Sequence, residues 1–318
     1  MLSSTADHLY WMARSMERAE NMARMLDVTY RMSLLKGATR EPFQQWRAML
    51  SISGLHYEYT QAHDEITADK VLHFMALDES NPSSIICSLQ NARENGRAVR
   101  GTITSEMWEA LNATWLEMRT RREAGIPADG ISAFFDWVKE RSHLSRGLTH
   151  GTMLRGDAFG FLRLGTFFER ADNTARILDV KYHILLPSLK DVGGAADYYQ
   201  WGALLRSVSA FESYRKVYRD VITPKRVAEL LILRADMPRS LHACVHEVNR
   251  LVQEIDGPRA RELQRLVGML YAELHYGRID EVIATGLHEY LTGVVSRLTA
   301  IGDQINRTYF WPSDDLAA

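Results

Sequence analysis

Two segments of this sequence place carboxylate, guanidinium and amide groups at matching positions. They are Glu17-Arg18-Ala19-Glu20-Asn21 and Glu169-Arg170-Ala171-Asp172-Asn173. A buried carboxylate either pairs with a cation or is protonated at a raised pKa, so Glu17 and Glu169 are candidates for acid–base catalysis. Guanidinium groups beside them suit bidentate capture of a carboxylate or a phosphate. These segments are therefore the first candidates for a functional site.

Helical periodicity places the polar residues of each segment on one line, because successive residues turn by about 100°. Arg18 and Arg170 point away from these lines, so only the glutamate of each Glu-Arg pair is predicted to face a central polar site. The candidates for ligand binding are Arg14, Asn21 and Arg24 beside Glu17, and Asn173 and Arg176 beside Glu169.

A second stripe of each segment is apolar and is predicted to be core. Because the flanks of the first segment are also largely apolar, the polar line is expected to face another helix or a cavity. The core stripes are Met12, Met16, Ala19, Ala23, Leu26 and Tyr30 in the first copy, and Leu164, Phe168, Ala171, Ala175, Leu178 and Tyr182 in the second.

Two interpretations of the polar lines stay open. In the structural one, glutamate, arginine and asparagine form a buried network that fixes the register of the central helices. In the functional one, two carboxylates and several guanidinium groups surround a cavity, bind a carboxylate or phosphate, and transfer protons. Ion-pair networks also perturb pKa values without any catalysis, so a shifted pKa does not decide between them.

An arginine cluster forms the second candidate site. Arg93, Arg97, Arg100 and then Thr104 share one face of a predicted helix. Arginines on one face repel each other unless anions neutralise them, and their planar guanidinium groups suit bidentate binding of an anion. A solvated charged surface is the alternative. The anions are a bound ligand or acidic side chains of the protein, namely Glu17, Glu169 or Glu106.

The two Glu-Arg segments belong to a longer internal repeat. Aligning residues 16–30 with residues 168–182 gives ten identities in fifteen positions. This similarity predicts a duplicated helix, with the two copies packed about an approximate two-fold axis.

The whole chain is predicted to be all-α, a multi-helix bundle of about a dozen helices. Segments between glycine- and proline-containing breaks are rich in Leu, Ala, Met, Arg and Glu, with apolar residues at spacings of three and four, while strand patterns are missing. A linker at Gly193-Gly194 predicts a division into residues 1–190, a core with both repeats, and residues 191–318, a helical part packed on that core. Residues 312–318 are expected to form a frayed tail.

Composition narrows the function classes. The 38 Lys and Arg against 40 Asp and Glu give a formal net charge of -2, so bulk charge attracts neither nucleic acid nor an anionic membrane. Charged residues interrupt every apolar run before the roughly 20 residues of a spanning helix, and no signal peptide pattern opens the sequence. With only two cysteines, Cys87 and Cys244, a soluble cytoplasmic protein is expected.

No motif assigns a cofactor or a metal. His242 and His246 have metal-binding spacing but lack an intervening glutamate at the position that zinc proteases use, and Glu140-Arg141-Ser142-His143 is a single copy of a pattern that di-iron bundles need twice. The glycine-rich nucleotide loops and the serine hydrolase elbow are missing as well. His150, in a glycine-rich stretch before the second repeat, is expected to be structural or exposed.

The first motif, from Leu9-Tyr10-Trp11 through Glu17-Arg18, and its echo from Leu164-Gly165 through Glu169-Arg170 resemble the bacterial alpha-E domain family, which is defined by a conserved Glu-Arg motif. Gly96 and Gly101 depart from the family pattern and are expected to loosen the arginine helix. Further segments with this resemblance are Ala92-Arg93-Glu94-Asn95, Glu106-Met107-Trp108-Glu109 and Pro238-Arg239-Ser240-Leu241.

The resemblance implies a helical protein whose gene neighbours are circularly permuted ATP-grasp ligases and transglutaminase-like peptidases. The resemblance first implies that this chain is a binding or accessory protein. Such a protein would work with an ATP-grasp-type amide ligase and hold a carboxylate-bearing or amino-acid-like ligand. The alternatives are an enzyme of amide or peptide metabolism, with Glu17 or Glu169 as acid/base and Arg93, Arg97 and Arg100 as an anion clamp, and a purely structural protein.

Overall fold

The prediction of an all-α protein is confirmed. The computed structural model describes residues 1–34, 42–125, 130–184, 195–255 and 260–311, and within these ranges it contains fifteen α-helices and no strand. This number exceeds the predicted dozen because several breaks in the sequence separate short helices. One turn of π-helix, η2 (Asn306–Phe310), follows the last α-helix.

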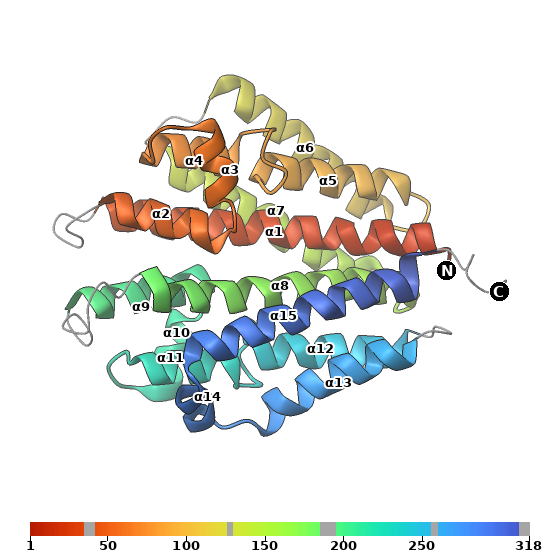
Figure 1. Cartoon of the computed structure of the whole chain (residues 1–318). Helices are drawn as coiled ribbons and strands as arrows, with labels where there is room; N and C mark the ends of the chain where they lie inside the picture. The colour runs from red at the N-terminus through yellow and green to blue at the C-terminus, as the bar shows by residue number, and fades with distance from the viewer. Residues whose placement is uncertain (35–41, 126–129, 185–194, 256–259, 312–318) are drawn as a thin grey trace.

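Two long helices, α1 (Ser3–Ser33) and α8 (Asp157–Ile184), form the centre of the bundle (Figure 1). Their contacts advance in the same direction along both helices, since Tyr10 meets Gly165 and Phe168 while Glu17 meets Arg170. The two helices are therefore parallel, and the two Glu-Arg segments lie at the same level. A Cβ on Gly165 would lie 2.3 Å from the Tyr10 carbonyl oxygen, so only glycine permits this approach.

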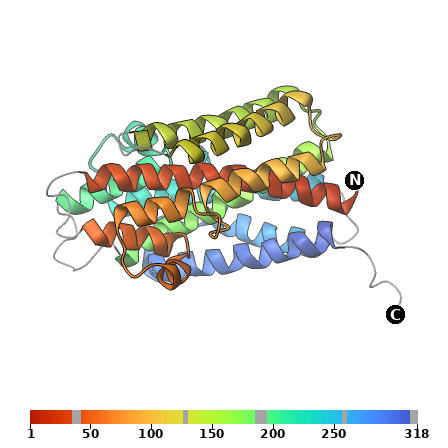
Figure 2. The ribbon, with the colours of Figure 1, turned by 90° about the horizontal axis from the view of Figure 1, so that it is seen from above.

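Helix α1 organises one side of the bundle, where it packs on α5 and α7 as well as on α8. Figure 2 shows α5 lying beside α1 on this side of the molecule. The helices that follow α1 and precede α8 along the chain are α2 (Pro42–Ile52), α3 (His56–Ala62), α4 (Ala68–Ala76), α5 (Ile85–Ala98), α6 (Ser105–Ala124) and α7 (Ile131–Thr152).

Helix α8 organises the other side, where it packs on α12 and α15. The end of α15 returns to the start of α1, where the rings of Phe310 and Tyr10 lie 5.3 Å apart (Figures 1 and 2). The helices of this side are α9 (Ala195–Ser207), α10 (Phe211–Tyr218), α11 (Pro224–Ile232), α12 (Leu241–Glu254), α13 (Ala260–Tyr276), α14 (Ile279–Thr285) and α15 (Leu287–Ile305).

Capping residues set several helix starts. The Ser84 side chain accepts a hydrogen bond from the Cys87 amide, and Thr223 caps α11 in the same way with Pro224 in its first turn. Helix α1, by contrast, begins at Ser3 without a side-chain cap.

The arginine helix is shorter than predicted. It ends at Ala98, and Thr104 caps α6 by accepting a hydrogen bond from the Met107 amide, so Arg100 and Thr104 are not on a common helical face with Arg93. Gly96 does not loosen α5 as expected. A Cβ at Gly96 would lie 2.8 Å from Leu111 and 3.2 Å from Met12, so this glycine lets three helices pack closely.

The core stripes of α1 and α8 are buried as predicted from Met12 to Leu26 and from Leu164 to Leu178, while Tyr30 is half-buried. The Tyr182 side chain, the linker at Gly193-Gly194 and the tail 312–318 lie outside the described residues, so the division at residue 190 stays a prediction. Across the described part of the chain, no helix is both long enough and apolar enough to cross a bilayer.

Candidate functional site

The central feature of the interface between α1 and α8 is an exchange of ion pairs between the two Glu-Arg segments. Arg170 donates from Nε and Nη2 to the two carboxylate oxygens of Glu17, each at 2.9 Å. In return, Arg18 donates from Nε and Nη2 to Glu169, at 2.6 and 3.0 Å. Each carboxylate is thus held by the arginine of the opposite segment in a bidentate arrangement.

This exchange corrects the prediction that Arg18 and Arg170 point away from the polar site. The helical projection treats each helix alone, whereas parallel helices at the same level present the arginine of one copy to the glutamate of the other. A guanidinium group on a long side chain reaches sideways across the interface. Arg170 is 7% exposed and Glu17 is 1% exposed, so the pair between them is buried.

Two further arginines reach Glu17 from other helices. Arg146 of α7 donates to the Glu17 carboxylate at 3.0 Å, and Arg239, just before α12, donates to it at 2.9 Å. Arg239 also donates at 3.0 Å to Asn21 Oδ1, while Asn21 Nδ2 is buried without a partner among the described residues. Glu17 and Asn21 therefore lie where four helical segments meet.

Glu20 is the second buried carboxylate on this side. It accepts hydrogen bonds from Arg239 at 2.6 Å, from Arg24 at 2.8 Å and from Ser142 at 2.7 Å, and it is also paired with Arg146. Arg24 continues outward to Ser209 at 2.6 Å and to His143 at 3.1 Å. Within the described residues, Glu17 and Glu20 thus face four guanidinium groups, which come from Arg24, Arg146, Arg170 and Arg239.

The surroundings of Glu169 are different. Besides Arg18, it accepts a hydrogen bond at 2.7 Å from Arg14, whose guanidinium group lies 4.7 Å from the Trp11 ring centre and 5.0 Å from that of Phe168. Arg14 also donates to the Tyr10 hydroxyl at 3.3 Å. Aromatic rings therefore close over this pair, and cation–π contacts add to its stability.

Both glutamates of the repeat are held in the ionised form. Burial raises the pKa of Glu169, but the charges of Arg14 and Arg18 outweigh it and leave the pKa at about 2. Burial likewise raises the pKa of Glu17, and the charges of Arg170 and Arg239 bring it below its ordinary value. A carboxylate with a lowered pKa is a weak proton acceptor near neutral pH, so this geometry favours anion pairing over acid–base catalysis.

The remaining groups of the network follow the same electrostatics. Burial raises the pKa of Glu20, but the hydrogen bond with His143 and the charges of Arg239, Arg146 and Arg24 leave it well below its ordinary value. For Arg170, burial lowers the pKa and the Glu17 carboxylate more than offsets this. The pKa of Arg239 is lowered, chiefly by burial.

A cavity of about 320 Å³ opens beside this network, between α1, α7 and α8. Glu17, Arg146 and Arg170 line it together with Arg163 and the hydroxyl groups of Ser142, Ser145, Thr149 and Thr166. We call it the arginine cavity. Arg170 Nη1 and the Nε and Nη2 of Arg146 donate to no other group in the described ranges, so guanidinium donors next to this cavity remain available for an anion.

His150 and Arg163 form one wall of the arginine cavity. Arg163 donates from Nη1 to His150 Nε2 at 2.8 Å. The pKa of His150 is lowered by burial and by the charges of Arg163 and Arg155, so His150 is neutral near pH 7 and accepts this hydrogen bond. His150 was expected to be structural or exposed; it is an exposed residue that also lines a cavity.

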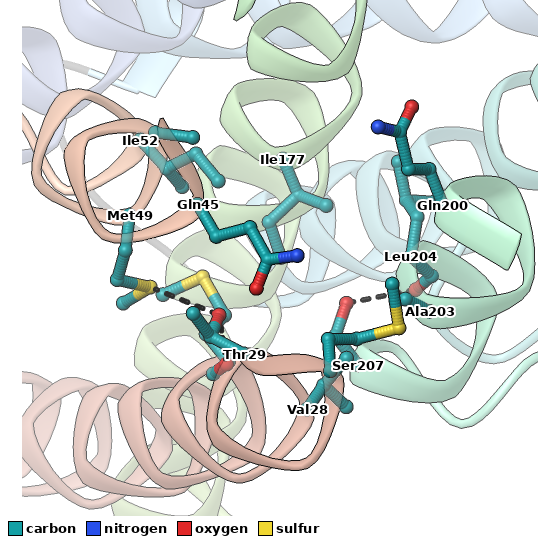
Figure 3. A pocket seen from close by; sticks show the side chains of 13 residues that line it. Val28, Thr29, Gln45, Met49, Ile52, Ile177, Gln200, Ala203, Leu204 and Ser207 are labelled. Carbon is teal, nitrogen blue, oxygen red and sulfur yellow. Dashed lines mark hydrogen bonds between the residues drawn. The ribbon is translucent and has the colours of Figure 1, made fainter. Parts of the chain in front are cut away.

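A smaller cavity of about 90 Å³ lies between α1, α2, α8 and α9 (Figure 3). Its walls are mainly apolar and include Met25, Met32 and Met49, and the hydroxyl groups of Thr29 and Ser207 donate to backbone carbonyls at 2.8 and 2.7 Å. No charged side chain lines it among the described residues, so it offers nothing to hold an ionic ligand.

The arginine cluster does not join the central site. Arg93 and Arg97 both pair with Glu94, a partner that was not among those predicted, and Arg97 is 65% exposed. The guanidinium groups of Arg93 and Arg100 lie 5.7 and 5.6 Å from the Trp108 ring centre. This part of α5 and α6 is a partly solvated charged surface with cation–π contacts.

The other predicted positions are divided between network and surface. The network includes Arg14, Glu17, Asn21, Arg24 and Glu169, whereas Arg176 pairs with Asp172 at 2.8 Å and Asn173 is only half-buried. Sequence reasoning missed Glu20, Arg146 and Arg239. Arg239 stands in a segment already noted for its resemblance, which was the one available signal, while Ser142 and Arg146 lie one helical turn apart on a face that no pattern singled out.

The described residues contain no group of three or more His, Cys, Asp or Glu side chains arranged to hold a metal ion. Cys244 lies near the network, and burial raises the pKa of its thiol to about 12, so it is protonated and unreactive at neutral pH.

Comparison with known proteins gives one family. A family model described as a predicted alpha-helical domain with a conserved ER motif matches residues 1–310. An uncharacterized protein of Mycobacterium bovis is 25% identical over an alignment of 330 positions, which covers 94% of this chain and 36% of that protein. A relative from Mycobacterium tuberculosis strain H37Rv, also uncharacterized, is 24% identical with the same coverage.

The chain thus spans about a third of the length of the curated relatives it matches. No solved structure matches it significantly.

Proposed function

The chain belongs to the Alpha-E family, the helical domains with a conserved Glu-Arg motif, and from this premise we propose that it binds a carboxylate-bearing, amino-acid-like ligand in the arginine cavity. In this proposal it acts as an accessory partner of an ATP-grasp-type amide ligase in the cytoplasm. The free thiols of Cys87 and Cys244 suit that reducing compartment.

The observation that carries the proposal is the excess of guanidinium groups over carboxylates beside the cavity. Four arginines face Glu17 and Glu20, and donors of Arg146 and Arg170 remain without a partner in the described residues. Buried cations are costly unless anions neutralise them. A ligand carboxylate on Arg146 and Arg170 would complete the neutralisation and make charge-assisted hydrogen bonds.

The role as an accessory protein is supported by the state of the carboxylates. Glu17 and Glu169 are ionised and engaged by arginines, so neither is placed to donate a proton at neutral pH. In the longer relatives the matched region takes up 36% of the chain, an arrangement expected of a domain that works beside other domains.

The ligand part of the proposal is tested by titration calorimetry with N-acetyl-L-alanine as the probe, since it carries one carboxylate and one amide. Arg146→Gln removes donors from the cavity while leaving three arginines around Glu17 and Glu20. We expect the dissociation constant to rise by about ten- to a hundredfold, the value of hydrogen bonds to a charged group. The matched control is Arg97→Gln on the exposed part of α5, which should bind as the wild type does.

Failure of the probe to bind, or equal binding by the Arg146→Gln variant, would contradict the ligand assignment. The partner assignment is tested separately by mixing the purified protein with a circularly permuted ATP-grasp-type ligase from the same organism, the class of partner that the family resemblance implies. Complex formation on size-exclusion chromatography, or a change in ligase turnover, is expected. The absence of both would overturn the accessory role.

A further inference from the structure

A second cavity, of about 450 Å³, adjoins the arginine cavity on α8. It is bounded by α8, α12 and α13 and shares Arg163, Phe167 and Arg170 with the arginine cavity. These three residues have i, i+4 and i+7 spacing and so form one face of the helix. The two cavities are therefore neighbours, separated only by this row of side chains.

The row is built around an aromatic ring. The guanidinium group of Arg163 lies 4.8 Å from the Phe167 ring centre, and that of Arg170 lies 5.2 Å from it. Arg163 is held from both sides, because it donates to His150 of the arginine cavity and pairs with Glu247 of the second cavity. Its Nε is buried without a partner among the described residues.

The far wall of the second cavity consists of ring side chains, and we call it the ring cavity. Tyr271 lies 5.8 Å from His242, 5.4 Å from His246 and 5.3 Å from His275, measured between ring centres. His242 and His275 are themselves 5.2 Å apart. Such a cluster presents ring faces and edges to whatever enters the cavity.

Hydrogen bonds hold these rings in place. His242 donates from Nδ1 to the Leu233 carbonyl at 2.8 Å, because a carbonyl oxygen can only accept. Its Nε2 lies 3.2 Å from His275 Nδ1, and the Tyr271 hydroxyl lies 3.3 Å from the same His275 nitrogen. A wall fixed in this way loses little conformational entropy when a ligand binds.

The charges of the ring cavity are already paired. Glu247 is engaged by Arg163 and by Arg250, the latter at 3.1 Å, and Nε and Nη2 of Arg170 are engaged by Glu17, which leaves only the Nη1 donor already assigned to the arginine cavity. This cavity therefore suits a neutral planar group better than a second anion. Ring faces, together with the guanidinium groups of Arg163 and Arg170, favour an aromatic ring.

We infer that the two cavities form one two-lobed site for an aryl-bearing carboxylate such as an aromatic amino acid derivative. The carboxylate lies in the arginine cavity, the chain crosses the row at Phe167, and the aromatic ring packs in the ring cavity. This inference rests on the proposed function for the carboxylate end and adds the chemical class of the other end.

The test compares three probes by titration calorimetry on the full chain. N-acetyl-L-phenylalanine carries the ring, N-acetyl-L-alanine lacks it, and N-acetyl-L-cyclohexylalanine replaces it with an aliphatic group of similar size. We expect the phenylalanine derivative to bind about tenfold more tightly than the alanine derivative, as stacking on an aromatic wall provides, with the cyclohexyl derivative between them.

Two variants locate the gain. Tyr271→Leu should abolish the advantage of N-acetyl-L-phenylalanine without changing the affinity for N-acetyl-L-alanine. His246→Leu, at an exposed position next to Tyr271, should reduce the advantage of N-acetyl-L-phenylalanine. Because the position is exposed, this variant should fold, and it tests the inference even where the Tyr271 variant misfolds. Tyr57→Leu is the matched control, because Tyr57 is 70% exposed on α3 and lines neither cavity.

The outcomes separate the inference from the proposed function. Equal affinities for the three probes, or an advantage that persists in both the Tyr271 and His246 variants, would overturn the aromatic lobe while leaving the carboxylate site standing. Cyclohexylalanine and phenylalanine derivatives of equal affinity would overturn the choice of an aromatic ring. Failure of all three probes to bind would contradict the proposed function itself.

Discussion

Glu17 and Glu169 occupy equivalent positions in the two Glu-Arg segments, and each accepts two hydrogen bonds from the arginine of the opposite segment. Around Glu17, α7 and the start of α12 add Arg146 and Arg239, and a cavity opens beside the carboxylate. Around Glu169, aromatic rings close over the pair. The difference comes from the neighbouring helices, so the same local sequence gives a cavity wall in one copy and a packed ion pair in the other.

The largest expected effect comes from removing each carboxylate in turn. Glu17→Gln leaves Arg146, Arg170 and Arg239 without this counter-charge and should lower the free energy of unfolding by about 3–5 kcal/mol. Glu169→Gln should cost less, about 2–3 kcal/mol, because Arg18 is 29% exposed and water can solvate it. Urea unfolding of both variants measures this difference.

Glu109→Gln, at an exposed position in the second turn of α6, is the control for these two variants and should change little. Losses of equal size for Glu17 and Glu169 would break the comparison. If the Glu17→Gln variant is as stable as the wild type, the structural interpretation of Glu17 is wrong, and its interpretation as a catalytic acid or base is favoured.

The second largest effect is expected from acid, which should remove the contribution of the Glu169 ion pairs to the free energy of unfolding. Its pKa is lowered from an ordinary 4.5 to about 2, so its contribution is fully present above about pH 4.5 and is lost as the pH falls through about 2. The shift corresponds to about 3 kcal/mol. The free energy of unfolding of the wild type should therefore fall toward that of Glu169→Gln over this range, measured by urea unfolding at each pH. A constant gap between the two curves would contradict the assignment.

The close approach of the central helices predicts a smaller effect. Gly165→Ala places a Cβ against the Tyr10 carbonyl and should destabilise the protein by about 1–3 kcal/mol through overpacking, with both Glu-Arg pairs forced apart. Gly268→Ala in α13 is the matched control, because the nearest atom to its Cβ would be 3.9 Å away, and it should stabilise by about 0.5–1 kcal/mol. Equal melting temperatures for the two variants would refute the close contact.

The smallest effect is expected on the surface of α5. Arg97→Ala removes an exposed ion pair with Glu94 and should change the free energy of unfolding by less than about 0.5 kcal/mol. Thermal unfolding at low and high salt measures it. A loss comparable to that of the central variants would mean that the arginine cluster belongs to the same network after all.

The helices and much of the core could be predicted because apolar spacing along a helix determines its buried face. The stripe from Met12 to Leu26 is buried as expected. Ser84 and Thr223, residue types that favour a helix start, cap α5 and α11. The end of α5 was missed because nothing in its periodicity changes before Arg100, although the helix ends at Ala98.

The site was only partly predictable for a different reason. The face analysis found Glu17 and Asn21, because the periodicity of their own helix determines which face they occupy. It missed Arg170 as a partner of Glu17 because that pairing depends on the parallel alignment of α1 with α8, and it missed Arg146 because α7 contributes it from elsewhere in the chain. Contacts between distant segments leave no periodic trace in one helix.

The contact between Arg239 and Glu17 joins residues 222 positions apart, and it has a consequence during synthesis on the ribosome. Translation is slow, so α1 emerges long before the helices that pack on it, and at first only partners within α1, such as Arg24 for Glu20, are present. Arg146 and Arg170 arrive later, and the last counter-charge arrives with Arg239. The ion-pair network around Glu17 and Glu20 can therefore be completed only after most of the chain has been translated.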